Sequence, residues 1–124
     1  KRYKRKLNSA MARALIWMWS THRYDWVNVA QTSPRHIRNS AEYSKLALWG
    51  MVESKLTSAG KTTRDWRVTD KGAAFVRDCL PVARYVYVYN NVVDSDSYDS
   101  DQVKIREALG SHFSYPELMG FTDG

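Results

Sequence analysis

The spacing of hydrophobic residues changes along positions 40–80, and each spacing predicts a different element. Apolar side chains first recur at roughly helical spacing, at Tyr43, Leu46, Ala47 and Trp49. Ser40 can cap such a helix, and Gly50 follows it where a helix end favours a residue that tolerates positive φ. The sequence therefore predicts a helix over residues 40–49.

A β-hairpin is predicted directly after this helix. Met51, Val52 and Leu56 begin a strand-like run, and residues 57–64 are polar with one glycine, as a hairpin tip requires. Beyond the tip, apolar and charged side chains alternate over residues 65–68 with the period of a strand that has one buried face.

A further helix is expected to begin at a Thr cap. Thr69 has the right side chain for this cap, and Asp70 is favourable at the positive end of a helix. The apolar side of this helix is formed by Ala73, Val76 and Leu80, extended by Phe75 and Cys79. Cys79 is the only cysteine, so it forms no internal disulfide, and we expect a buried thiol that is compatible with a reducing cytoplasm.

The first forty residues predict an arm, a helix and two short elements. Residues 1–6 form a basic arm, and Asn8 or Ser9 can cap a helix that runs to about Ser20. Residues 26–29 are β-like, and Ser33 followed by Pro34 predicts a short helix over residues 34–38. The expected order is helix, strand, helix, helix, strand, hairpin tip, strand and helix.

Two short motifs in this order resemble a known family. Trp49-Gly50-Met51-Val52-Glu53 and Val68-Thr69-Asp70-Lys71-Gly72, separated by a polar loop and a strand, resemble winged-helix regulators of the MarR and PadR type. The resemblance implies an α+β fold with a winged helix-turn-helix and double-stranded DNA as the partner. The general character of the chain also resembles small phage-encoded proteins. We therefore expect a winged-helix domain with a basic N-terminal arm over residues 1–80.

The pattern changes after Pro81 and predicts a C-terminal hairpin and short helices over residues 81–124, packed on the same domain. Three tyrosines alternate with valines over residues 85–89, and Asn90-Asn91 can form the turn of a second hairpin. Asp101 can cap a helix over residues 102–109, and residues 116–119 predict a last helical turn.

Charge is distributed unevenly along the chain. The net charge of +6 is composed of +8 over residues 1–49, +3 over residues 50–93 and −5 over residues 94–124. The N-terminal part therefore attracts phosphate and the C-terminal part repels it. We expect the acidic part to face away from nucleic acid.

The candidate DNA contacts lie on the expected third helix and on the hairpin. Arg and Asn can form bidentate contacts with base edges in the major groove, and a basic hairpin tip suits phosphates beside the minor groove. An ordinary solvated helix face and an ordinary polar tip are the simpler alternatives, and the basic arm either contacts phosphates or is merely solvated. The predicted DNA-binding residues are Arg35, Arg38, Asn39, Ser40, Tyr43, Lys45, Lys55, Lys61, Thr62 and Arg64.

The aromatic residues favour a core and a protein contact over base stacking. Trp17, Trp49 and Trp66 occupy positions expected to be buried. The stripe of Tyr85, Tyr87 and Tyr89 more often marks packing or a protein interface than a stacking platform. The alternative function is therefore a winged-helix module that binds a protein, such as a host protein bound by a phage protein, or a second copy through the C-terminal part.

Catalysis, metal binding and membrane insertion have little support. The three histidines lack metal-ligand spacing, no glycine-rich phosphate loop is present, and the aspartates of residues 94–101 do not match a calcium loop, which needs Gly at its sixth position, here Asp99. The longest apolar run, residues 10–19, is broken by Arg13 and is too short to span a bilayer. We expect a non-enzymatic protein without cofactor, located in the cytoplasm of a bacterial cell or of a phage-infected host.

Overall fold

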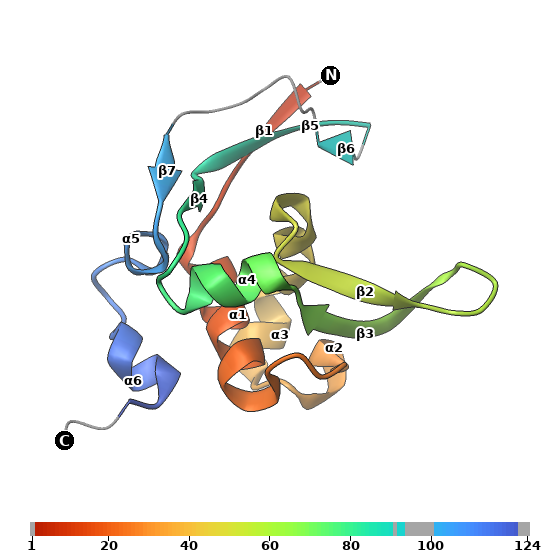
Figure 1. Ribbon diagram of the computed structural model, residues 1–124, viewed down its shortest axis with the longest axis horizontal. Helices are drawn as coiled ribbons and strands as arrows, with labels where there is room; N and C mark the ends of the chain where they lie inside the picture. The colour runs from red at the N-terminus through yellow and green to blue at the C-terminus, as the bar shows by residue number, and fades with distance from the viewer. Residues whose placement is uncertain (1, 91, 94–100, 122–124) are drawn as a thin grey trace.

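The computed structural model is a mixed α+β structure that describes residues 2–90, 92–93 and 101–121. Helix α1 contacts α3, η1, β3, α4, α5 and α6, so it lies at the centre of the fold (Figure 1). None of the helices in the described ranges has the length and apolar character needed to cross a membrane. The elements are β1 (Arg2–Lys6), α1 (Ser9–His22), α2 (Val29–Thr32), α3 (Arg35–Ser40), the 3-10 helix η1 (Tyr43–Trp49), β2 (Val52–Leu56), β3 (Thr62–Val68), α4 (Asp70–Val76), β4 (Val82–Ala83), β5 (Tyr85–Tyr89), β6 (Val92–Val93), β7 (Gln102–Val103), α5 (Ile105–Leu109) and α6 (Tyr115–Met119).

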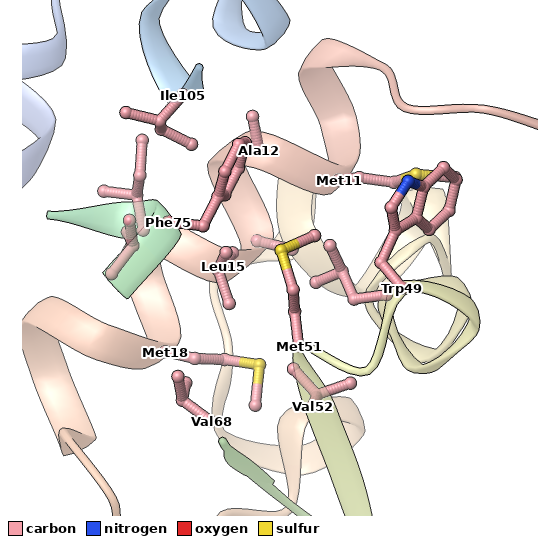
Figure 2. Close-up of a cluster of buried hydrophobic side chains, with 14 of the residues drawn as sticks. Met11, Ala12, Leu15, Met18, Trp49, Met51, Val52, Val68, Phe75 and Ile105 are labelled. Carbon is pink, nitrogen blue, oxygen red and sulfur yellow. The ribbon is translucent and has the colours of Figure 1, made fainter. Parts of the chain in front are cut away.

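The buried core draws side chains from both halves of the chain. Leu15 of α1, Met51 before β2 and Phe75 of α4 are completely buried, and Ile105 of α5 joins them from the C-terminal part (Figure 2). Because α1 presents apolar residues around most of its circumference, elements can pack on several of its sides. Helices α5 and α6 of the C-terminal part therefore contribute to the same core.

The predicted β2–β3 hairpin is confirmed. Its strands are antiparallel, with Val52 opposite Val68 and Glu53 opposite Arg67, and the register shifts between Ser54 and Leu56. β3 begins earlier than expected, so residues 62–64 belong to a strand and only residues 57–61 form the tip. The predicted short β-like run is also found, as an isolated bridge between Val27 and Trp66.

The helix predicted over residues 40–49 is wrong in its start and in its type. Ser40 ends α3, where its hydroxyl donates a hydrogen bond to the Ile37 carbonyl (2.8 Å), and Ala41 adopts a left-handed conformation with φ 53°. The next segment, η1, is a 3-10 helix whose period of three places Tyr43, Leu46 and Trp49 on one side. This side faces the core, since Leu46 and Trp49 are buried.

Asparagine side chains cap the two helices that precede α3 in the chain. The side chain of Asn8 accepts a hydrogen bond from the Met11 amide (2.9 Å), so Asn8 rather than Ser9 caps α1. The sequence did not predict the second short helix, α2. Asn28 caps it, because its side chain accepts a hydrogen bond from the Gln31 amide (3.1 Å). A turn at Ser33 and Pro34 then leads into α3, close to the short helix that the sequence predicts there.

Thr69 caps α4 as predicted, but the helix is shorter than its apolar pattern suggests. The Thr69 hydroxyl accepts from the Gly72 amide (3.1 Å) and donates to the Gly50 carbonyl (2.6 Å), which ties the helix start to the beginning of the hairpin. The helix ends at Val76, so Cys79 lies beyond it and is exposed. The expectation of a buried thiol is therefore wrong.

The basic N-terminal segment is a strand rather than a free arm. Residues Arg2–Lys6 pair antiparallel with Tyr85–Tyr89, and β6 pairs with the other side of β5. The resulting sheet has the order β1-β5-β6 and lies beside the helices (Figure 1). The second predicted hairpin, β5–β6, is confirmed by this pairing.

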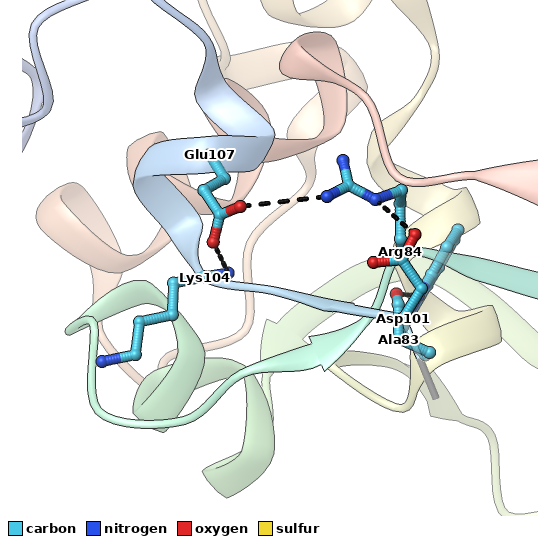
Figure 3. A network of polar contacts seen from close by, with 6 residues as sticks. Ala83, Arg84, Asp101, Lys104 and Glu107 are labelled. Atoms are coloured by element: carbon cyan, nitrogen blue, oxygen red, sulfur yellow. Dashed lines mark hydrogen bonds and ion pairs between the residues drawn. The ribbon is translucent and has the colours of Figure 1, made fainter. Parts of the chain in front are cut away.

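Polar contacts attach the start of β7 to β4 and α5 (Figure 3). The Arg84 guanidinium donates from Nε to Asp101 (2.8 Å) and lies 3.8 Å from the Glu107 carboxylate. Asp101 therefore pairs with Arg84 and does not cap a helix over residues 102–109, because residues 102–103 form β7 and α5 begins after Lys104. The other aspartates of the predicted acidic loop lie outside the described residues.

The tryptophans are divided between buried and half-buried positions. Trp49 is buried as predicted, and its indole Nε1 donates to the Ala83 carbonyl (2.7 Å). Trp19 is also buried, whereas Trp17 and Trp66 remain partly exposed, contrary to expectation. All four pack in or against the core.

Alkaline pH should weaken the attachment of α6. Tyr115 is buried, and its hydroxyl donates to the Val76 carbonyl (2.6 Å). Burial raises the pKa of Tyr115 above its ordinary value of 10.0, and the nearby charge of Asp78 adds to this effect. Because the folded state favours the neutral phenol, this contribution to stability is present below pH 10 and is lost as pH rises through the folded-state pKa.

Tyr115→Phe should therefore cost about 1 kcal/mol of unfolding free energy at pH 7, through loss of the hydrogen bond. Its urea stability should then decline less steeply than that of the wild type above pH 10. Equal slopes for the two proteins would contradict the role given to the phenol.

Candidate nucleic-acid interface

Helix α3 presents a polar face with three of the predicted DNA-binding residues. Arg35, Arg38 and Asn39 are spaced as i, i+3 and i+4, which places them on the same side of a helix, and all three are exposed. Ile37 is buried on the core side and anchors the helix. This face carries two guanidinium groups and one amide, which are the groups that best recognise guanine and adenine edges.

The 3-10 helix η1 contributes less than its sequence suggests. Tyr43, predicted as an outward contact, is half-buried, and its ring packs edge-on against Trp66 with 6.3 Å between centroids. Lys45 is the only cation of η1 and is also half-buried. The Ser40 hydroxyl is engaged with the backbone of α3. The structure therefore moves the candidate reading surface from η1 to α3.

The β2–β3 hairpin projects away from the body of the protein (Figure 1). Lys61, at the tip, and Thr62 and Arg64, on β3, are exposed, as is Lys55 on β2. Because side chains alternate along a strand, Arg64 shares a face with Trp66. The charge of Arg64 therefore lies on the same hairpin face as Trp66, the residue on which Tyr43 of η1 packs.

The opposite face of the hairpin carries the other cations. The Lys55 ammonium is 5.9 Å from the centroid of the Trp26 ring, and the Arg67 guanidinium lies over the same ring at 4.3 Å. Arg67 also forms a 2.6 Å ion pair with Glu53, which neutralises its charge. Within the described residues, Lys55, Lys61 and Arg64 have no ion pair. The hairpin is thus a ridge with positive charge on both faces rather than one flat patch.

The structure also places lysines of β1 beside the tyrosine stripe of β5, and the sequence did not indicate this combination. Pairing of β1 with β5 sets Lys4 opposite Tyr87 and Lys6 opposite Tyr85. No local sequence pattern predicts a pairing between segments so far apart along the chain. Only the alternation of tyrosines with valines gave a hint that one face of β5 would point outward.

The described ranges offer no metal centre. No group of three or more His, Cys, Asp or Glu side chains within them is arranged to hold an ion.

No protein-family model, curated protein or solved structure matches this chain.

Proposed function

We propose that residues 1–80 form a winged helix-turn-helix that binds double-stranded DNA, with α3 in the major groove and the β2–β3 hairpin as the wing. The observation that carries the proposal is the exposed face of Arg35, Arg38 and Asn39, followed along the chain by a projecting basic hairpin. Transcriptional regulation or another transaction on phage or bacterial DNA is the role that such binding would serve.

The order of elements supports this proposal. α2, the turn at Ser33 and Pro34, and α3 follow one another in the order of a helix-turn-helix, a motif whose second helix reads bases. The bridge between Val27 and Trp66 ties the start of this unit to the hairpin. Contacts of α3 with α1 and η1 hold it against the core, so its outer face is fixed relative to the body.

Salt dependence tests the electrostatic part of the proposal. If Arg35, Lys55, Lys61 and Arg64 each neutralise one phosphate, log affinity against log salt should have a slope of about −3.6, or −0.9 per phosphate. Lys61→Ala should flatten this slope by about 0.9 and leave sequence preference unchanged. Mobility shifts with a duplex over a salt series measure both values.

Lys104→Ala is the matched control, since Lys104 is an exposed lysine of the C-terminal part. Its slope should equal that of the wild type. A wild-type slope near zero would contradict duplex binding and favour the alternative of a protein-interaction module.

Arg38 tests base reading. On a duplex selected from a random library, Arg38→Ala should cost about 1–3 kcal/mol of binding free energy and relax the preference at one position. Arg38→Lys separates two kinds of contact, because Lys keeps the charge but loses the bidentate geometry. If Arg38 contacts a base, the Arg38→Lys variant should bind without the sequence preference of the wild type. Wild-type affinity and sequence preference in Arg38→Lys would show that Arg38 contacts a phosphate and not a base.

A further inference from the structure

The outward face of the β1-β5-β6 sheet combines lysines with tyrosines from two different strands. Directly opposite residues of an antiparallel pair lie on the same face, so Lys4 neighbours Tyr87 and Lys6 neighbours Tyr85. The intervening Val86 and Val88 are buried in the core, so the tyrosine side points away from it. We name this side the Lys–Tyr face and define it by Lys4, Lys6, Tyr85, Tyr87 and Tyr89.

Contacts within the Lys–Tyr face bring positive charge to the aromatic rings. The Lys4 ammonium is 4.1 Å from the centroid of Tyr85 and 6.0 Å from that of Tyr87, so it lies near both rings. Lys4 and Lys6 are exposed, and Tyr89 at the end of the strand is 50% exposed. β1, β5 and β6 contain no Asp or Glu, so these strands bear only positive charge.

We propose that the Lys–Tyr face binds single-stranded DNA, with bases stacked on the tyrosine rings and phosphates held by Lys4 and Lys6. This surface is separate from α3 and the β2–β3 hairpin and uses other residues. Only the choice of DNA rather than RNA rests on the proposed function; the binding of a single strand is argued from the face itself.

The spacing of the rings favours a single strand over a duplex. Side chains two residues apart on a strand are separated by roughly 7 Å, about twice the ~3.4 Å between stacked nucleotides of a duplex strand. Neighbouring bases can therefore reach neighbouring rings only when they are unstacked from each other. Stacking accepts every base because each has a π face, so we expect little sequence preference.

The charge pattern favours nucleic acid over an apolar protein partner. A ring with an ammonium beside it suits a ligand that alternates flat bases with phosphates. The contact between Lys4 and Tyr85 is an exposed cation–π contact, which is weaker than one stacked base, so the lysine can leave the ring for a phosphate. An apolar protein surface would instead leave these lysines without counter-charge.

Fluorescence anisotropy with a labelled oligo-dT of roughly 12 nucleotides tests the proposal. Tyr87→Leu and Tyr89→Leu should each weaken binding by about tenfold, because Leu keeps an apolar side chain but removes the stacking ring. Tyr87→Phe keeps the ring and should bind like the wild type. Lys4→Gln should flatten the salt slope by about 0.7, the value for one phosphate of a single strand.

Controls separate this face from the duplex site. Tyr24→Leu removes a tyrosine outside the sheet whose exposure (46%) is similar to that of Tyr89 (50%), and it should leave oligo-dT binding unchanged. Lys61→Ala should weaken duplex binding only, and the Tyr87 and Tyr89 variants should weaken oligo-dT binding only. Either proposal can therefore fail without the other. If Tyr87→Leu does not fold, as judged by circular dichroism, Tyr89→Leu at the exposed strand end and Lys4→Gln still give the answer.

Three results would overturn the proposal. Wild-type protein that does not bind oligo-dT at low salt has no such site. Oligo-dT binding that is insensitive to Tyr87→Leu, Tyr89→Leu and Lys4→Gln lies on another surface. Binding of oligo-U that is about tenfold tighter than that of oligo-dT would assign the face to RNA rather than DNA.

Discussion

Gly72→Ala should destabilise the protein by about 3 kcal/mol or more, because the added methyl group has no space. A Cβ at this position would lie 2.1 Å from the Met51 carbonyl oxygen and 2.9 Å from Cγ1 of Val68. The oxygen belongs to the backbone and itself accepts a hydrogen bond from the Thr69 amide (3.0 Å), so it cannot move without breaking the contact between α4 and the hairpin. Urea unfolding followed by circular dichroism measures the loss.

Gly60→Ala is the comparison that separates crowding from backbone strain. Gly60 has φ +80° at the hairpin tip, and no atom lies within 4 Å of the position that a Cβ would take, so only the left-handed backbone opposes a side chain there. We expect a cost of about 1 kcal/mol. Equal costs at the two glycines would contradict the close approach of α4 to the residue before β2.

Ile105→Asp should destabilise the protein by about 4 kcal/mol or more. Ile105 is completely buried, and truncation of such a side chain alone typically costs about 2–5 kcal/mol. Asp adds the cost of a carboxylate without a partner in an apolar environment. Because α5 packs on α1, the damage should extend to the core around Phe75 and not stay within the C-terminal part.

Ser111→Asp is the matched control, since Ser111 is exposed just after α5 and should tolerate the same charge. The midpoint of urea unfolding and the molecular mass in solution should both be measured. Normal stability and unchanged mass for Ile105→Asp would show that α5 is neither core nor interface.

The parts of the fold that the sequence predicted are those with local causes. Gly50 has φ 73°, which its position after the helix required, and Thr69 caps α4 through its own hydroxyl. The polar run between two apolar segments predicted the β2–β3 hairpin, and the sequence pair Asn90-Asn91 predicted β5–β6. In each case the deciding residue is within a few positions of the structure that it specifies.

The errors come from contacts that no local pattern contains. Residues 40–49 have a helical apolar spacing, yet the left-handed Ala41 interrupts the helical path. The segment after it is a 3-10 helix in which Tyr43 packs on Trp66. Asp101 looks like a helix cap but is held by Arg84, which is distant in sequence. Arg38 and Asn39 were expected at the start of the reading helix, whereas they lie with Arg35 on α3, the helix before it.

The pairing of β1 with β5 is expected to form late in folding and to open early in the native state. It joins two strands that are far apart in the sequence, so closing it carries the entropy of a long loop, and such contacts form late in folding. Within the described residues β1 pairs with β5 alone, and terminal segments with few contacts open at low free energy in the native state. The amides of Tyr3 and Arg5 should thus exchange with deuterium earlier than those of α1. A ligand that spans both strands would slow that exchange in proportion to its occupancy.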